Sequence, residues 1–192
     1  MKTFDLTGSK RESIGKKAAK SYRKQELIPA VLYGGDEVVH FTVGKDGLRK
    51  LIYTPEVFIV NLAVDGKTTP AIVKEIQFHP VTDEVLHIDF LQVFADKPVA
   101  MEIPIVLEGL AQGVKEGGKL STEMRKLKVK GLYTDFPEKL VINVENLGLG
   151  KTIQVGELNF DKLELLNGKD NVVAAVKMTR AARGAAAAAA SA

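Results

Sequence analysis

Two histidines, a glutamine and an aspartate are spaced so that they share one face of two predicted strands. His87 and Asp89 lie two residues apart in the apolar run 85–93, and side chains two apart in a strand point to the same side. Gln77 and His79 have the same spacing in the preceding run. If the two strands are neighbours, these four side chains gather on one outward surface. The residues expected to face inward are Ile76, Phe78, Leu86, Ile88 and Phe90.

This surface has several possible roles. Two histidines and a carboxylate suit a metal ion, but nothing else in the sequence adds a ligand, and the chain has no cysteine. A catalytic pair would need a serine or cysteine nucleophile in a recognisable turn, which is missing. Polar recognition needs only donors and acceptors on a rigid sheet. From the residues alone, this surface is either a site of polar recognition or an exposed sheet face without a role. The sequence predicts no cofactor.

The glycine-rich stretch 113–118 does not form a phosphate-binding loop. It lacks the Gly-Lys-Ser/Thr ending whose lysine and hydroxyl match a nucleotide phosphate. We expect these glycines to permit positive φ angles in a turn or bulge. With no nucleotide motif and no nucleophile in a suitable setting, the sequence predicts a protein that is not an enzyme.

The basic residues are concentrated at the N-terminus. Residues 1–24 hold eight Lys or Arg against two acidic residues, a net +6, although the whole chain carries only +3. The remaining 168 residues hold 19 basic and 22 acidic groups, a net −3. Such asymmetry indicates a polyanionic partner, either a nucleic acid or a membrane surface.

A helix is expected from Lys16 to about Glu26, where Pro29 would end it. Its broad basic face is formed by Lys16, Lys17, Lys20, Arg23 and Lys24. The other face offers only two alanines and Tyr22, too little apolar area to insert into a membrane. The basic face either binds a polyanion or is simply solvated.

The remaining pattern predicts an α+β fold that is mostly β. Hydrophobic residues make up 45% and charged residues 27% of the chain, as in globular proteins. About six strands and short helices form an N-terminal domain, residues 1–93, and short strands between turns form a second mostly-β domain, residues 98–178. The alanine-rich segment 179–192 is expected to be a disordered tail. No apolar run is long enough to span a membrane, and the first residues lack a signal-peptide core, so a cytoplasmic protein is expected.

Four ordered segments resemble one known family. They are Lys10-Arg11 leading into LIPAVLYG (27–34), VKEIQFHP (73–80), LHIDF (86–90) and GLAQGVKEGGKL (109–120). Their order and spacing resemble the bacterial large-subunit ribosomal protein L-twenty-five family, also called general stress protein CTC, in its long two-domain form. The resemblance spans roughly residues 3–178. It implies an N-terminal six-stranded β-barrel with short helices that binds the minor-groove side of a distorted region of 5S ribosomal RNA.

The resemblance also implies which residues contact RNA. They are Arg11, Arg23, Tyr33, Gln77, His87 and Asp89, with further contacts from the basic helix (Lys16, Lys20, Lys24) and His79. Family members often have arginines where this helix has Lys20, and a lysine neutralises a phosphate without forming the two-pronged hydrogen bond of an arginine. Asp89 repels phosphates, so we expect it to accept hydrogen bonds from base amino groups or from a neighbouring histidine.

The resulting prediction is a structural protein of the 50S ribosomal subunit that binds 5S ribosomal RNA. It would be cytoplasmic, ribosome-associated, monomeric off the ribosome and not membrane-bound, and its second domain would contact RNA or neighbouring ribosomal proteins. One alternative is a stress-induced RNA-binding protein that acts partly off the ribosome. Another is a domain resembling the anticodon-binding part of a transfer-RNA synthetase, which the lack of a nucleotide-binding motif disfavours.

Overall fold

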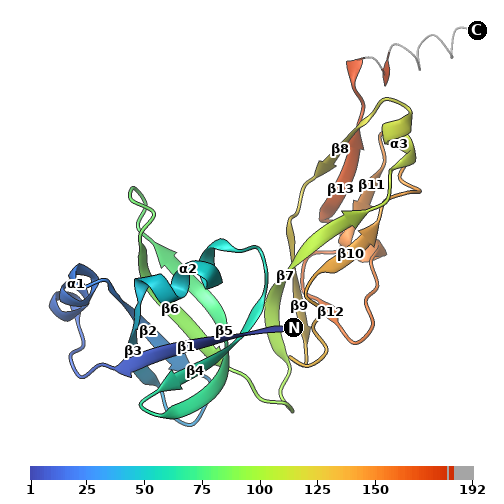
Figure 1. The fold of residues 1–192 in the computed structure, drawn as a ribbon. Helices are drawn as coiled ribbons and strands as arrows, with labels where there is room; N and C mark the ends of the chain where they lie inside the picture. The colour runs from blue at the N-terminus through green and yellow to red at the C-terminus, as the bar shows by residue number, and fades with distance from the viewer. Residues whose placement is uncertain (181, 184–192) are drawn as a thin grey trace, which may run out of the picture. The chain divides into compact units, whose positions relative to one another are not determined.

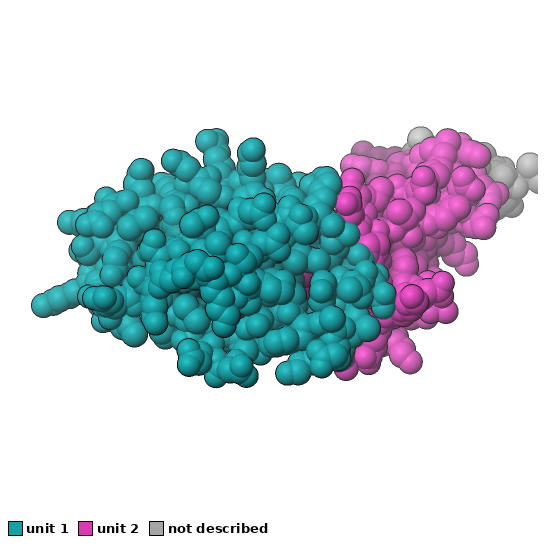
Figure 2. Space-filling model, turned by 60° about the horizontal axis from the view of Figure 1, so that its bottom comes forward, with its two compact units in different colours: residues 1–99, 132–136 teal, residues 100–131, 137–192 magenta. Residues whose placement is uncertain are grey.

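The chain folds into two compact units, both rich in β-strand. The computed structural model describes residues 1–180, 182 and 183. Unit 1 comprises Met1–Val99 with Leu132–Phe136, and unit 2 comprises Ala100–Gly131 together with the chain from Pro137 onward. Figure 2 colours the two units separately. Most of the tail expected at 179–192 lies outside the described residues.

Six strands of unit 1 form a closed barrel, as the resemblance implied (Figure 1). The strands are β1 (Lys2–Lys10), β2 (Leu27–Tyr33), β3 (Val39–Gly44), β4 (Phe58–Val64), β5 (Lys67–Phe78) and β6 (Val85–Gln92). Their order around the barrel is β1-β3-β2-β6-β5-β4, and parallel pairing of β1 with β4 closes it. Closure leaves no free sheet edge, so outward-facing side chains are held on a continuous wall.

Alternation along these strands builds the barrel core. Phe41, Val60, Ile88 and Phe90 are completely buried, while their immediate neighbours in sequence mostly face outward. Helix α2 (Lys45–Tyr53) adds Leu48 and Leu51 to the same core. Burial of apolar area is the main force that stabilises the barrel, so it also fixes which side chains point outward.

Helix α1 (Lys16–Lys24) ends before the expected position, and Pro29 does not end it. Glu26 has a φ of 60°, a left-handed conformation that redirects the chain into β2. Pro29 lies within that strand, where it has no N–H to donate. It is tolerated because the pairing of β2 with β6 begins only at Ala30.

The hairpin between β5 and β6 departs from simple alternation. Its register shifts between Gln77 and Phe78, and β5 ends at Phe78. One step along β5 corresponds to two along β6 at this point, so the extra residue, Leu86, lies in β6. Phe78, which was expected to face inward, is 43% exposed and is not part of the barrel core.

Unit 2 contains two small sheets and is the second β domain that was expected. The elements are β7 (Val99–Glu108), α3 (Gln112–Lys115), β8 (Lys119–Thr122), β9 (Lys126–Gly131), β10 (Leu140–Asn143), β11 (Thr152–Gln154), the 3-10 turn η1 (Val155–Glu157), β12 (Glu164–Leu165) and β13 (Val172–Lys177). One sheet has the order β10-β7-β9-β12, and the other has the order β11-β13-β8. No helix in the described part of the chain is long and apolar enough to cross a membrane.

Close backbone packing explains two glycines of the stretch 113–118, and a positive φ explains a third. A Cβ on Gly113 would lie 2.5 Å from the Leu149 nitrogen, and one on Gly118 would lie 2.5 Å from Val176 Cγ1. Gly117 has a φ of 88°, as expected for a turn. The first two glycines therefore let α3 and β8 approach the neighbouring backbone and β13.

Replacing Gly118 with alanine should destabilise unit 2, because the added methyl group would overlap Val176 and the Gly113 carbonyl oxygen. Overpacking of this kind costs about 1–3 kcal/mol. The measurement is native-state hydrogen exchange of the Val176 amide, which should become faster. Gly148→Ala is the matched control, since its new methyl group would meet nothing closer than 3.7 Å. Equal exchange in both variants would contradict the packing argument.

Candidate RNA-binding site

Neighbouring strands bring a set of polar side chains together on the outside of the barrel. Gln77 lies opposite His87 and Glu75 lies opposite Asp89 in the β5–β6 ladder. On the other side of β6, Val31 of β2 is the partner of Asp89. We call Tyr33, Glu75, Gln77, His87 and Asp89 the polar patch. The structure thus gathers Gln77, His87 and Asp89 on one outward surface, as their spacing predicts.

His87 and Asp89 form the central contact of the polar patch. His87 Nδ1 lies 2.7 Å from Asp89 Oδ1, and each side chain is 26% exposed. Because a carboxylate only accepts hydrogen bonds, Nδ1 must carry the proton. When the ring is neutral, Nε2 is left as an acceptor, so the aspartate fixes the imidazole's orientation and the hydrogen-bonding character of its other nitrogen.

Tyr33 and Glu75 extend the polar patch on either side. Burial, followed by the negative charges of Asp89 and Glu75, raises the pKa of the Tyr33 phenol. Tyr33 therefore keeps its hydroxyl proton at neutral pH and can donate a hydrogen bond. The sequence prediction missed Glu75, although its two-residue spacing from Gln77 places it on the same side of β5.

Arg23 ties the basic helix to the strand that carries the polar patch. Its Nη1 donates a hydrogen bond to the backbone oxygen of Leu86, at 3.2 Å, next to His87. Part of the guanidinium is thereby used within the protein, although other donors of the group remain. Lys16, Lys20 and Lys24 are exposed and, within the described chain, form no ion pair.

Arg11 lies on the wall of the same barrel, beside a histidine that the sequence prediction did not assign to the site. The Arg11 backbone N–H donates to the His40 oxygen at 3.0 Å. Arg11 Nε and His40 Nδ1 are both buried without a hydrogen-bond partner in the described structure. His40 pairs with Val31, which in turn pairs with Asp89, so one row of register partners leads from His40 to the polar patch. Buried polar atoms normally have hydrogen-bond partners, and these two are exceptions among the described residues.

His79 has a different place from the one its spacing predicts. It follows the end of β5, and its Nδ1 accepts hydrogen bonds from the N–H groups of Val81 and Thr82 at 3.3 and 3.2 Å. Its backbone also bonds Glu84 and Asp83 across the turn. Strand alternation does not place His79 on the same side as Gln77, because β5 ends at Phe78 and His79 belongs to the turn that follows. The contacts seen for His79 shape the tip of the hairpin.

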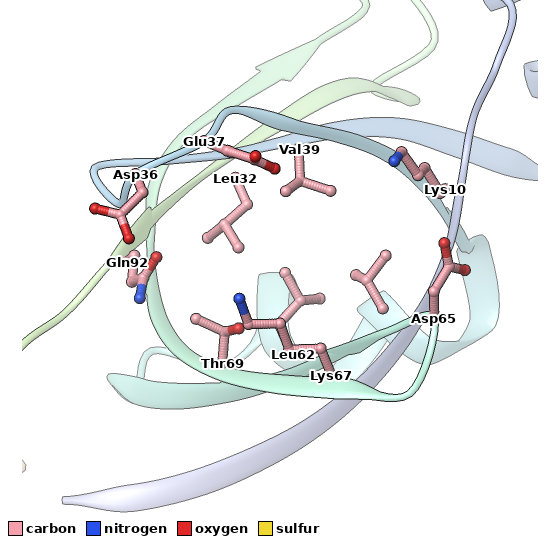
Figure 3. A pocket seen from close by; sticks show the side chains of 11 residues that line it. Lys10, Leu32, Asp36, Glu37, Val39, Leu62, Asp65, Lys67, Thr69 and Gln92 are labelled. Carbon is pink, nitrogen blue, oxygen red and sulfur yellow. The ribbon is translucent and has the colours of Figure 1, made fainter.

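The barrel also has a cavity of about 420 Å³ (Figure 3). Its walls include the apolar side chains of Leu32, Val39, Leu62 and Val64. The charged groups around it are Lys10, Lys67, Asp36, Glu37 and Asp65. Three carboxylates against two lysines do not favour a polyanion there. In the described part of the chain, no group of three His, Asp or Glu could hold a metal ion.

Comparison with known proteins relates both units to ribosomal proteins. The model described as the Ribosomal L25p family matches residues 6–90, and the one described as Ribosomal protein TL5, C-terminal domain, matches residues 98–180. A relative called large ribosomal subunit protein bL25, from Azobacteroides pseudotrichonymphae, is 69% identical over 184 residues, which cover 95% of this chain and 97% of the relative. The chain belongs to the Ribosomal L25p family.

Two further relatives with the same name support this membership. The protein of Parabacteroides distasonis is 62% identical over 190 residues, covering 96% of this chain and 98% of its own length. The protein of Porphyromonas gingivalis is 65% identical over 188 residues, which cover 97% of this chain and 98% of the relative. The Ribosomal L25p family is the L-twenty-five family that the sequence segments resemble. As a member, the chain is a ribosome-associated protein of the large subunit and not an enzyme.

Removing the Asp89 carboxylate should change the tautomer of His87. In the wild-type chain at alkaline pH, the His87 ring should carry its proton on Nδ1, because Asp89 accepts a hydrogen bond there. In Asp89→Ala the ring should shift toward the Nε2–H form that free imidazole prefers. Ring ¹⁵N chemical shifts report the tautomer. His79, whose Nδ1 accepts hydrogen bonds in the turn, is an internal control that should not change. Unchanged His87 shifts would show that the contact does not set the tautomer.

Proposed function

We propose that unit 1 binds 5S ribosomal RNA through the polar patch and helix α1. The observation that carries the proposal is the fixed hydrogen-bonding group of His87 and Asp89, set on a rigid barrel beside an exposed basic helix. We take residues 1–93 as the RNA-binding domain and residues 98–178 as the second domain. Membership in a family of large-subunit ribosomal proteins supports an RNA partner.

Helix α1 supplies the electrostatic part of this interaction. Five of its nine residues are Lys or Arg, and none is acidic. Cations that replace condensed counterions along a phosphate backbone gain free energy whatever the base sequence. Contacts of this kind position a protein on RNA but do not read its sequence. We therefore assign phosphate contacts to Lys16, Lys20 and Lys24, and to the free donors of Arg23.

The polar patch supplies the recognition part. Asp89 and Glu75 are two carboxylates on neighbouring strands, and phosphates close to them would be repelled. Base amino groups, in contrast, donate hydrogen bonds that these carboxylates accept. An RNA helix exposes base edges and 2′-hydroxyls in its wide, shallow minor groove. The carboxylates therefore favour a base edge or a 2′-hydroxyl over a phosphate at the polar patch, and Tyr33 and His87 add one donor and one acceptor.

A second candidate is an RNA-binding protein that acts partly off the ribosome under stress. The same polar patch would serve it, and the names of the relatives favour the ribosomal role. Co-sedimentation with 50S subunits in growing and stressed cells separates the two. For the ribosomal role we infer a cytoplasmic protein that is monomeric when free.

His87→Ala and Asp89→Ala should each weaken the binding of the full chain to 5S ribosomal RNA. Losing a hydrogen bond that reads a base costs about 1–3 kcal/mol, or roughly 5- to 150-fold in Kd. Fluorescence anisotropy with labelled 5S ribosomal RNA measures this. Asp5→Ala is the matched control, because Asp5 is also a carboxylate with a side-chain hydrogen bond, to Asn61, but lies on β1 across the barrel.

Two results would contradict the proposal. One is unchanged affinity in both polar-patch variants, or an equal loss in Asp5→Ala. The other is an affinity that hardly varies with salt, because binding anchored by phosphates must weaken steeply as salt rises.

A further inference from the structure

One end of unit 2 carries an unusual concentration of positive charge. The side chains are Lys115, Lys119, Lys151, Lys177, Arg180 and Arg183, which we call the cationic tip. They come from three separate segments, residues 112–119, residues 148–151, and the described residues 176–180, 182 and 183. In Figure 1, α3 lies at the same end of unit 2 as the start of β8. Together the three segments contain six basic residues and one acidic residue, Glu116.

Backbone pairing holds the three segments together. Lys119 of β8 is the register partner of Lys177 of β13. The Val176 N–H donates to the Lys151 oxygen at 3.0 Å, which adds the second segment. The Thr179 hydroxyl donates to the Gly117 oxygen at 2.7 Å, so Thr179, shortly after β13, lies beside the glycine-rich stretch. The close packing of Gly113 and Gly118 makes this framework compact.

The charges of the cationic tip are largely unneutralised. Lys177 pairs with Glu123 at 2.7 Å, and this pairing lowers the pKa of the Glu123 carboxyl. The other five basic side chains form no ion pair with any described residue. Lys119 and Lys177 also face each other directly across the ladder. Like charges in that position destabilise a sheet, and a bound anion would relieve the repulsion.

The composition of the cationic tip indicates phosphates as the partner. Its three segments contain no aromatic residue that could stack on a base. Their one exposed large apolar side chain is Met178, at 40% exposure, whereas protein interfaces rely on buried apolar and aromatic anchors. Clustered lysines and arginines without such anchors suit a phosphate backbone, which is recognised by charge alone.

We propose that the cationic tip is a second RNA-binding site, which contacts the phosphate backbone of ribosomal RNA in the large subunit. It would use different residues from the polar patch and would not read base sequence. Its basis is the charge and pairing within unit 2, so it does not depend on how unit 1 recognises RNA. The bound chain would then hold ribosomal RNA at two places.

The test compares two triple variants of the full chain that lose the same charge. Lys115→Gln/Lys119→Gln/Lys151→Gln removes half of the cationic tip. Lys126→Gln/Lys128→Gln/Lys139→Gln is the control, because these three lysines of unit 2 are also exposed and free of ion pairs with described residues. The probes are 50S subunits washed free of this protein, protein-free 5S ribosomal RNA and protein-free 23S ribosomal RNA, each titrated at several salt concentrations.

The tip variant should bind the washed subunits at least tenfold more weakly than the wild-type chain. It should also lose affinity for one of the two protein-free RNAs, which identifies the RNA that the tip contacts. The slope of log affinity against log salt should become shallower by about two to three, since each lost phosphate contact removes roughly 0.7–0.9 from it. The control variant should stay within twofold of the wild-type chain.

Three results would overturn the inference. They are no loss in the tip variant, equal losses in both variants, and a loss on subunits with none on either protein-free RNA, which would indicate a neighbouring protein. The test of the cationic tip can succeed or fail independently of the test of the polar patch. If His87→Ala and Asp89→Ala leave 5S binding unchanged while the tip variant loses affinity, only the proposal for unit 1 fails.

Discussion

The pairing of β6 between β2 and β5 is the constraint on which the candidate site depends. Ile88 and Phe90 must be buried in the barrel, and this burial turns His87 and Asp89 outward. The two ladders then fix which side chains flank them, with Gln77 on one side and Tyr33 on the other. A slip of one residue in β6 would bury the polar pair and expose the core. The same packing that stabilises the barrel therefore determines the geometry of the polar patch.

In unit 1 the basic helix and the carboxylates of the polar patch are on separate elements. Helix α1, which Arg23 fastens to the backbone of β6, carries only basic charged residues, whereas Asp89 and Glu75 are on the sheet. If they were mixed, lysines would neutralise Asp89 and Glu75, and neither phosphates nor base amino groups would find a free partner. The net charge of +3 hides this separation because the body of the chain offsets the basic N-terminal segment. In unit 2 the segments of the cationic tip likewise contain six basic residues and only one acidic residue.

The sequence predicted much of unit 1 because alternation is a direct consequence of burying one side of a strand. It placed Gln77, His87 and Asp89 on one surface and indicated a mostly-β fold. It misplaced Phe78 and His79 because the point where β5 ends and the turn begins depends on how the β5–β6 hairpin closes. His40 was missed because its significance lies in a buried, unpartnered nitrogen that only the folded chain reveals. The cationic tip was missed for a similar reason, since its three segments meet only through pairing of β8 with β13 and the turns beside them.

The central claim is that the outward wall formed by β2, β6 and β5 is the surface that binds 5S ribosomal RNA. The most direct measurement is a map of NMR chemical-shift changes in the full chain as unlabelled 5S ribosomal RNA is added. The largest changes should fall on Tyr33, Gln77, His87 and Asp89 and on the lysines of α1, with little change around the cavity of the barrel. Changes confined to that cavity or to β1 and β4, with the polar patch unaffected, would contradict the claim.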